Sequence, residues 1–384
     1  MNEAQNLQDF QKTQPALSPL AVPEPRNAED FRALRRARRF KARLFWTVAF
    51  LLLPALSLYC ITLGPFPVEA ETLRRVLVSA LHPLTAAPAD TDAATAHYIV
   101  LHLRFARVVL ALVVGAALAL SGTVYQGILL NPLADPFTLG VSTGAAFGAS
   151  TAILFGWTSW KLAGMGMLPV MAFLGALGAL GLVLLLGRLQ GRIHPTTLVL
   201  GGIIISTFLS AWISLLKSLH EESLSAIVFW IMGSLSGRSW QHVLAILPYM
   251  LVGSWVIFSY AREMDLLALG DTAAFQSGVP TDRVRRRLLA AASLVAAAAV
   301  AVSGVVGFIG LVVPHVARLC LGPAHRQLLP AAMILGALLT LVSDTLARTI
   351  LADGREIPLG VVTAILGAPF FAYLLIRKKK AVML

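Results

Sequence analysis

Charged side chains at the ends of long apolar segments are the residues of this chain best placed to do chemistry. Arg104 and Arg107 precede one apolar segment, and Arg348 follows another. Asp344 lies four residues before Arg348, and this i, i+4 spacing predicts a local ion pair that orients the arginine. The three arginines have two interpretations: side chains that reach from helix ends toward water, or a ring of positive charge that receives an acidic partner.

Patterns for catalysis and metal binding are absent from the sequence. The eight histidines are scattered and show none of the i, i+4 or clustered spacings of a metal site. The letters GxSxG occur at Gly140–Gly144, but they lie among glycines spaced by four, which is typical of helix packing and not of a nucleophile turn. No GxxxxGK[ST] phosphate loop occurs. We therefore expect no catalytic residue, no metal site and no bound cofactor, with a proton relay through Asp344 as a lesser alternative.

The composition places the chain in a membrane. Of its 384 residues, 57% are hydrophobic and only 13% are charged, whereas a soluble domain carries about 25% charged residues. Long apolar runs interrupted by prolines fit helices better than the alternating strands of a barrel. In a soluble protein the net charge of +12 would favour nucleic acid. Here it indicates topology and contact with anionic lipid headgroups, so we expect no nucleic-acid partner.

About ten segments are apolar enough to form membrane helices. They are expected near residues 44–64, 106–129, 138–156, 163–187, 196–217, 241–260, 286–307, 311–320, 328–346 and 360–376. The segment 311–320 is too short to span alone, so we expect a half-helix that packs inside the protein. Arginines and lysines gather on one side of this topology, which predicts a multi-pass membrane protein with both termini in the cytoplasm.

Two regions follow from this division. Residues 1–43 are expected to be a basic, disordered cytoplasmic tail, and residues 44–380 are expected to be the transmembrane domain. The outer loop between the first two apolar segments is long enough for a short amphipathic helix at 69–81.

The transmembrane domain contains a short internal repeat. With an offset of 182 residues, Ser121-Gly122 meets Ser303-Gly304, and Pro132 meets Pro314. The helices that carry these pairs run in opposite directions on the predicted topology. We therefore expect two inverted halves with a path at their interface, an arrangement typical of alternating-access transporters.

The longest inner loop, residues 261–285, is predicted to hold two short helices. Gly270-Asp271 is interpreted as a helix stop followed by the N-cap of the second helix, which ends at Gly278. A solvated connector would not need the apolar residues of this loop, which include Leu266, Leu267, Leu269 and Phe275. The loop is therefore expected to form a knob that another protein grips.

Six motifs, in order along residues 44–377, resemble the FecCD family, the permease subunits of ABC importers for iron–siderophore complexes, haem and vitamin B12. They are LRFARVVLALVVGAALALSG, NPLADPFTLGVSTGAAFG, LALGDTAAFQSGV, AVSGVVGFIGLVVPHVAR, SDTLAR and EIPLGVVTAILGAPFF. The resemblance implies the all-α fold of a type II ABC importer permease in the bacterial inner (plasma) membrane, and a homodimer with a central path. It also implies two partners besides membrane lipid: a dimer of ATPase subunits that uses ATP and Mg²⁺, and a periplasmic substrate-binding protein.

The resemblance also places functional residues by motif. Arg104, Arg107 and Arg348 match the outer arginines that receive glutamates of the binding protein. Thr196 and Thr197, after His194-Pro195, lie where the family has its inner gate. The residues that match the coupling helices, which sit in a cleft of the ATPase, are Leu266, Leu267, Leu269, Gly270, Asp271, Phe275, Gln276 and Gly278.

The cargo implied by the resemblance is an iron chelate, either a ferric siderophore or haem. Cobalamin and molybdate are the alternatives within the family. An ion-coupled secondary transporter is the alternative from another class, but such a protein needs ionisable residues inside its spans, and the middles of these helices are nearly free of them.

Overall fold

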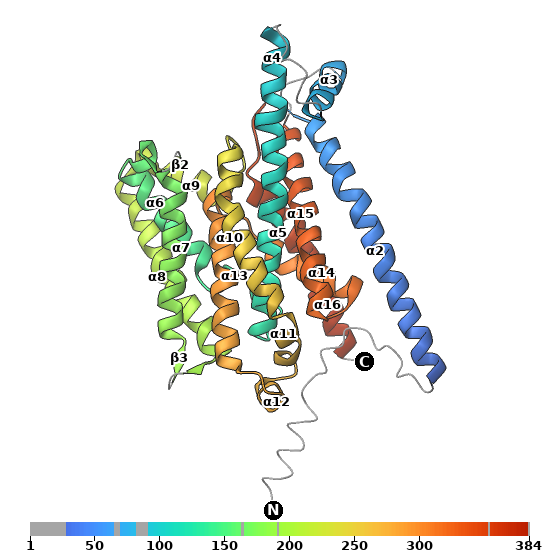
Figure 1. The fold of residues 1–384 in the computed structure, drawn as a ribbon. Coiled ribbons are helices and arrows are strands. Elements are labelled where there is room, and N and C mark those ends of the chain that lie inside the picture. The colour runs from blue at the N-terminus through green and yellow to red at the C-terminus, as the bar shows by residue number, and fades with distance from the viewer. Residues whose placement is uncertain are drawn as a thin grey trace, which may run out of the picture.

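The chain forms a bundle of helices of unequal length (Figure 1). The computed structural model describes residues 28–64, 70–81, 91–162, 165–189, 192–351 and 354–382. Its helices are α2 (Ala28–Thr62), α3 (Ala70–Leu81), α4 (Thr91–Tyr98), the π-helix η1 (Ile99–Arg104), α5 (Phe105–Ile128), α6 (Val141–Leu154), the 3-10 turn η2 (Trp157–Ser159), α7 (Met167–Leu186), α8 (Pro195–Leu219), α9 (Glu221–Ile231), α10 (Trp240–Ser259), α11 (Ala261–Leu267), α12 (Asp271–Gln276), α13 (Thr281–Ser303), α14 (Ile309–Leu321), α15 (His325–Thr349) and α16 (Leu359–Val382). Two antiparallel two-residue hairpins, β1 (Lys161–Leu162) with β2 (Met165–Gly166) and β3 (Arg188–Leu189) with β4 (Arg192–Ile193), join α6 to α7 and α7 to α8.

The predicted order of apolar segments is confirmed. Within the described ranges, seven helices are long and apolar enough to cross a membrane, and three shorter apolar helices complete the series at Val141–Leu154, Ile309–Leu321 and Leu359–Tyr373. The half-helix expected at 311–320 is α14, and much of it is buried against its neighbours, as non-spanning backbone at membrane depth requires. The chain is therefore an all-α polytopic membrane protein.

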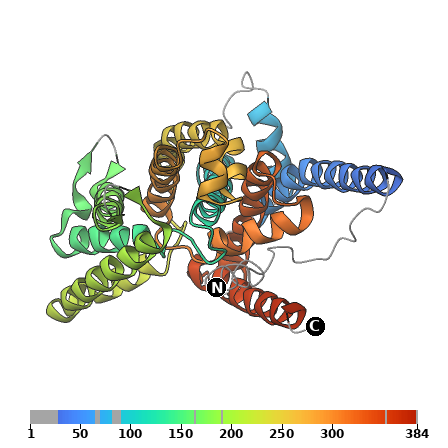
Figure 2. The ribbon, with the colours of Figure 1, turned by 90° about the horizontal axis from the view of Figure 1, so that it is seen from below.

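The first helix begins earlier than predicted. Residues 28–43, expected to be disordered, form the first turns of α2, while residues 1–27 lie outside the described part of the chain. The segment 28–43 is rich in alanine and arginine and contains neither glycine nor proline, and a helix already anchored in a span extends without a new nucleation step. Figures 1 and 2 show this N-terminal half of α2 leaning away from the bundle.

The predicted inverted repeat is present at the level of whole helices. The series α5, α6, α7, α8 and the series α13, α14, α15, α16 each contain a long helix, a short helix and two long helices. Figure 1 shows α4 at one end of the bundle, where α5 begins, and α12 at the other end, where α13 begins. The first helices of the two series therefore run in opposite directions.

The residue-by-residue offset of 182 is wrong. Gly122 lies in the middle of α5, whereas Gly304 is the C-cap of α13 and has a φ of 68°. Pro132 lies in the turn after α5, whereas Pro314 lies inside α14. The glycine packs against a neighbouring helix at position 122 and ends a helix at position 304. The sequence match therefore does not mark structurally equivalent positions.

Glycines let the central helices approach backbone to backbone. A Cβ atom added at Gly115 of α5 would overlap the carbonyl group of Gly336 in α15, and the reverse also holds. Gly144 of α6 packs in the same way on Gly175 of α7, which confirms the packing role predicted for the glycines of α6. Such close approach supplies van der Waals attraction in lipid, where apolar surface gains little from association.

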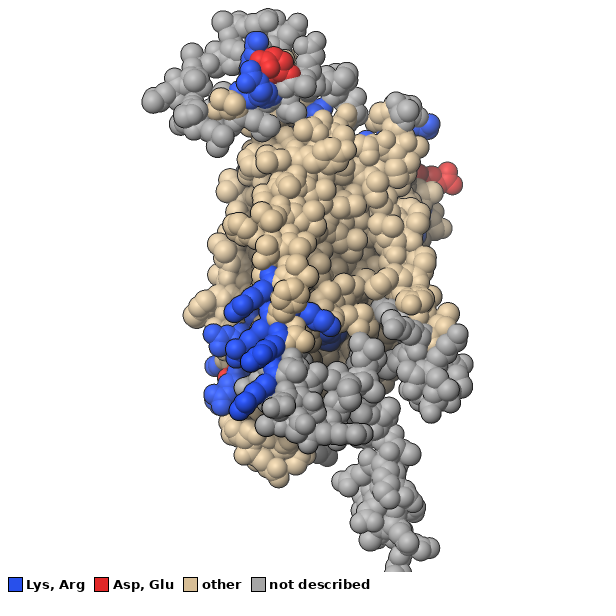
Figure 3. Space-filling view, turned by 90° about the vertical axis from the view of Figure 1, so that its right-hand side faces the viewer, with Lys and Arg blue, Asp and Glu red and all other residues tan. Residues whose placement is uncertain are grey.

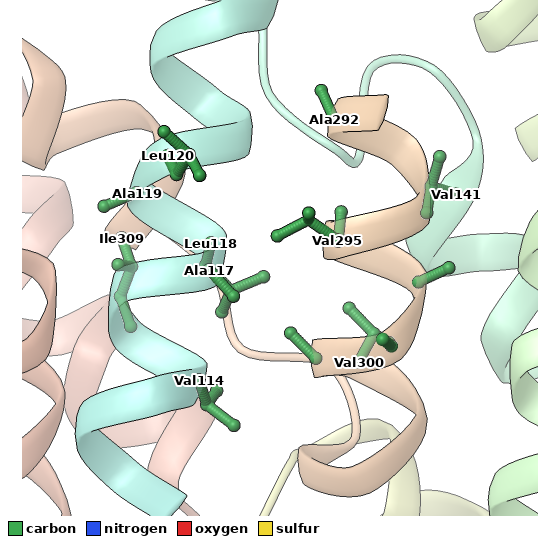
Figure 4. Packing of buried hydrophobic residues seen from close by; sticks show 14 of the residues in the cluster. Val114, Ala117, Leu118, Ala119, Leu120, Val141, Ala292, Val295, Val300 and Ile309 are labelled. Atoms are coloured by element: carbon green, nitrogen blue, oxygen red, sulfur yellow. The ribbon is translucent and has the colours of Figure 1, made fainter. Parts of the chain in front are cut away.

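Small and branched side chains fill the space between α5 and α13. Figure 4 shows Val114, Ala117 and Leu118 of α5 in the same buried cluster as Val295 and Val300 of α13. Two buried hydrogen bonds cross this interface: Ser121 donates to the carbonyl oxygen of Ala292 at 2.8 Å, and the hydroxyl groups of Tyr125 and Ser293 lie 2.6 Å apart. The core is therefore continuous across the two inverted halves.

An alanine in place of Gly122 should destabilise the fold. The added methyl group would overlap the backbone of Gly310 at the start of α14, and overpacking of this kind costs about 1–3 kcal/mol. The matched control is Gly181→Ala in α7, where no described atom lies within 4 Å and alanine is the better helix former. Thermal unfolding of the purified variants in detergent measures both effects. Equal melting temperatures would contradict the close approach of α5 and α14.

Candidate functional site

Arg104 and Arg348 are buried at the end of the bundle that carries α3 and α4, called the α3 end below. Arg104 is 5% exposed and Arg348 is 3% exposed. Arg104 donates to two carbonyl oxygens at 3.1 and 3.2 Å, and Arg348 donates to two more at 2.7 and 2.8 Å, all within residues 60–63. These carbonyl groups lie at the end of α2, where the helix supplies no partner for them. The two guanidinium groups therefore cap α2 and hold it to α5 and α15.

Arg107, in the first turn of α5, is the centre of an ion-pair network. It donates to both carboxylate oxygens of Asp344 in α15 at 2.9–3.1 Å, and to both oxygens of Glu356 at 2.7 and 2.9 Å. The side chain of Asp344 is fully buried. Arg348 lies 3.7 Å from Asp344, so the predicted i, i+4 ion pair is confirmed, but it is the longer of the two ion pairs that Asp344 makes.

The prediction that these arginines form an exposed ring of charge is wrong. Arg104 and Arg348 are buried, and the side chain of Arg107 is only 12% exposed. The reason is that carboxylates or helix-end carbonyl groups of the same chain accept their hydrogen bonds, which allows a charge to be buried. The role of these arginines in docking a binding protein stays a prediction.

Glu356 is the member of this network that sequence reasoning missed. It lies in the loop between α15 and α16, 249 residues from Arg107, so no local spacing connects the two. Burial acts to raise the pKa of the Glu356 carboxyl group, but hydrogen bonds and the charge of Arg107 outweigh burial and lower the pKa from its ordinary value. The carboxylate is therefore charged at neutral pH. The available signal was one acidic residue directly before an apolar helix, in the motif EIPLG.

The amphipathic helix predicted at 69–81 is α3, and it carries exposed charge at this end. The side chains of Arg74 and Arg75 are 71% and 76% exposed, and both pair with Glu71, at 2.9 and 3.1 Å. Figure 3 shows this small group of blue and red atoms at the top of the molecule. Water screens exposed pairs of this kind, so they contribute little to stability and can exchange for pairs with a partner.

The predicted two-helix knob is present at the opposite end, called the α12 end below. Figure 1 shows α11 and α12 at the foot of the bundle. Gly270 joins the two helices with a φ of 102°, and Gly278 follows α12 with a φ of 82°. Both values lie in the region that side chains disfavour, so glycine is needed at each turn. The knob is therefore built into the local sequence.

The knob has a buried side and an exposed apolar side. Leu267 is 1% exposed and anchors α11, whereas Leu269 and Phe275 are 71% and 72% exposed. Exposed apolar side chains beyond the membrane-spanning segments are suited to contact with another protein, and the coupling role of these residues stays a prediction. The other predicted contact residues are the partly exposed Leu266 and Gly270 and the exposed Asp271, Gln276 and Gly278.

Asp271 does not cap α12, which corrects the sequence interpretation. The N-cap is Gly270, and the Asp271 carboxylate instead accepts hydrogen bonds from Arg285 of α13 at 2.7 and 3.3 Å. Arg285 is 1% exposed and also donates to the carbonyl oxygen of Ile128, the last residue of α5, at 3.2 Å. Asp271 thus supplies the counter-charge that a buried arginine needs, and the pair joins the knob to α13 and α5.

A second connection joins the knob to α15. One carboxylate oxygen of Asp265, in α11, accepts the backbone N–H of His325 at 2.9 Å and lies 2.6 Å from Nδ1 of the same residue. His325 is the first residue of α15, and its ring packs where a side chain at Gly127 of α5 would otherwise lie. The knob is therefore held by α5, α13 and α15 together.

The other predicted positions do not assemble into a site. Thr196 is exposed and Thr197 is partly exposed in the first turn of α8, and their role in a gate stays a prediction. Among the residues that the structure describes, no three His, Cys, Asp or Glu side chains lie close enough to hold a metal ion.

Replacing Asp344 by asparagine should destabilise the protein by about 3–5 kcal/mol, because it leaves two buried arginines with less counter-charge. Glu71→Gln is the matched control, since it removes an exposed ion pair that water screens and should leave the stability almost unchanged. Unfolding of both variants in the same detergent gives the comparison. A loss as small for Asp344→Asn as for Glu71→Gln would show that the network contributes nothing to stability.

Comparisons with known proteins agree with this geometry. The model of the FecCD transport family matches residues 51–377. The cobalamin import system permease protein BtuC of Halobacterium salinarum is 41% identical over 86% of this chain and 95% of its own length, and the hemin transport system permease protein HmuU of Yersinia pestis is 41% identical over 74% of this chain and 84% of its own. Relatives named for import of ferric citrate and of molybdate match as well.

A solved structure of an ABC transporter has a similar fold. It is described as an inward-facing conformation of a metal-chelate type ABC transporter, and it matches with a TM-score of 0.73 and 33% identity over 87% of this chain and 99% of its own. The family model covers most of the chain, and the knob, the inverted halves and the half-helix all lie within the matched residues. This chain belongs to the FecCD transport family, whose members are permeases of ABC importers.

Proposed function

We propose that a separate ATPase drives this permease to import an iron chelate, a ferric siderophore or haem, that a periplasmic binding protein delivers. The observation that carries the proposal is the knob of α11 and α12, which presents Leu269 and Phe275 at the end opposite α3. ATP and Mg²⁺ act on the ATPase subunits. In this mechanism their closure moves the knob, and the two halves of the bundle tilt to open the path on the other side of the membrane.

The connections of the knob fit this use. A force on α12 reaches α13 and α5 through Asp271 and Arg285, and a force on α11 reaches α15 through Asp265 and His325. α5 and α13 belong to opposite halves of the inverted repeat. A single displacement of the knob therefore acts on both halves at once, as alternating access requires.

We infer that a second copy of the chain completes the path. Large apolar side chains point outward from α8 and α16, among them Phe208, Trp212, Ile365 and Tyr373. Figure 2 shows these two helices reaching outward on the same side of the bundle. A homodimer that joins these faces would enclose a central path between the copies.

The membrane orientation follows from charge. Basic side chains gather on the part of α2 that lies toward the α12 end, and Figure 3 shows a broad uncharged band next to them. The exposed members described there are Arg32, Arg36, Arg39, Lys41 and Arg43. Positive charge marks the cytoplasmic side, so we place the knob and both chain termini in the cytoplasm and the α3 end outside, at the inner membrane.

The binding protein would then dock at the α3 end. Its acidic groups would meet the exposed Arg74 and Arg75 first, and would reach Arg107 only by competing with Asp344 and Glu356. Cobalamin and molybdate remain the alternative cargoes, because relatives named for them match too. An ion-coupled secondary transporter is the alternative of another class.

The proposal predicts an ATPase that co-purifies with the chain and depends on the knob. Replacing both Leu269 and Phe275 by serine should weaken the complex by roughly thirtyfold, because it removes two apolar anchors of about 1 kcal/mol each from the interface. Phe155→Ser is the matched control, since Phe155 is 62% exposed in the turn between α6 and α7 at the other end.

The measurement is affinity capture of the tagged permease, followed by ATP-dependent uptake in proteoliposomes. Capture of the ATPase by wild type and by Phe155→Ser, but not by the double variant, is the expected result. Uptake that runs on an ion gradient without ATP would instead support the secondary transporter.

A further inference from the structure

A cavity of about 230 Å³ lies between α6, α8 and α9. It shares no described lining residue with the ion-pair network of Arg107 or with the knob. Its polar lining consists of Ser142 and Thr143 at the start of α6 and Ser210, Ser214 and Lys217 of α8. Apolar side chains, including Phe137 and Ile231, form the rest. The volume is below that of a pocket for a whole drug-sized ligand, about 300–1,000 Å³, so it fits one edge of a larger molecule.

The polar residues of α8 lie on one face of the helix. Ser210, Ser214 and Lys217 are spaced i, i+4 and i+7, which places them in one row along the C-terminal half of the helix. Lys217 lies in the last turn of α8 and lines the cavity, so its long side chain can place the ammonium group in water at the helix end or against a polar ligand in the cavity. The row therefore indicates a surface that contacts something polar.

Ser142 supports the same conclusion from the opposite wall. It is 1% exposed, and its hydroxyl group has no hydrogen-bond partner among the described residues. Ser150 of α6 and Ser206 of α8 are also without a partner in the described part of the chain, but of these three hydroxyl groups only that of Ser142 lines the cavity. A buried hydroxyl group without a partner is unfavourable, so a group that enters the cavity would satisfy it.

The charge in the lining of the cavity is positive only. Lys217 is its single cation, and none of the described residues that line it is acidic. Glu221 and Glu222 are exposed at the start of α9, but neither lines the cavity, and no ion pair joins them to Lys217. The ammonium group therefore has no counter-charge from the described residues of its own chain, and an anionic group is the partner that this chemistry fits.

We propose that this cavity contacts the cargo during its passage, and that Lys217 selects anionic chelates, those with carboxylate or other oxyanion groups, over cargo without net charge. This inference rests on the proposed function. In the proposed homodimer, each copy would hold one anionic edge of the cargo through Lys217 and the adjacent hydroxyl groups. Ferric citrate, haemin and molybdate meet this requirement, and cyanocobalamin, which has no net charge, does not.

The test is uptake by the complete importer, with permease, ATPase and cognate binding protein in proteoliposomes. Ferric citrate, haemin, molybdate and cyanocobalamin are the probes. Wild type should transport an anionic probe. Lys217→Gln should reduce uptake of that probe roughly tenfold, the factor expected for one charge-assisted hydrogen bond, and Lys217→Arg should retain most of it.

Two further variants separate contact with cargo from a structural role. Lys161→Gln is the matched control, because Lys161 is exposed in the turn after α6 and does not line the cavity. Ser142→Ala removes a hydroxyl group that has no partner, so it should leave the melting temperature unchanged or raised while uptake falls.

Several results would overturn the inference. They are normal uptake of the anionic probe by Lys217→Gln and transport of cyanocobalamin alone by wild type. A third is that Lys217→Gln loses association with the ATPase and the binding protein to the same extent as it loses uptake. Each of them leaves the importer itself intact. Failure of the ATPase to co-purify with wild type would instead contradict the proposed function.

Discussion

The contact between α5 and α15 is the constraint on which the rest of the structure depends. At its centre the backbones meet at Gly115 and Gly336, where any side chain would force the helices apart. Lipid gives helices little hydrophobic reason to associate, so this close packing has to supply the attraction. The same pair of helices ends at the α3 end in the ion pair of Arg107 with Asp344. Fixing the separation of the two backbones therefore also fixes the geometry of that network.

The α12 end depends on the same pair of helices. The last residue of α5 accepts a hydrogen bond from Arg285, and the first residue of α15 binds Asp265 of the knob. Movement of the knob consequently reaches two helices that are in backbone contact and that carry the buried charges at the opposite end. This continuity gives a physical route between the knob at one end and the buried charges at the other, because packed elements move as units and do not deform gradually.

The helices and turns could be predicted from local sequence patterns, but most of the side-chain contacts between distant segments could not. Apolar length and proline placement predicted the helices, and the glycines of the inner loop predicted both turns of the knob. The environment of Arg107 was not predictable, because its partners Asp344 and Glu356 lie 237 and 249 residues away. The role of Asp271 was misassigned for a different reason: a local cap was a sufficient explanation for it, although its partner Arg285 lies on the next helix.

The central claim is that the knob is the cytoplasmic contact of a separate ATPase, and labelling of one cysteine tests it most directly. In a background with exposed Cys320 replaced by serine, Phe275→Cys is exposed to a membrane-impermeant maleimide in right-side-out and in inverted vesicles. We expect reaction in inverted vesicles only, and protection when the ATPase subunits are bound. Reaction in right-side-out vesicles, or equal labelling with and without the ATPase, would contradict the account.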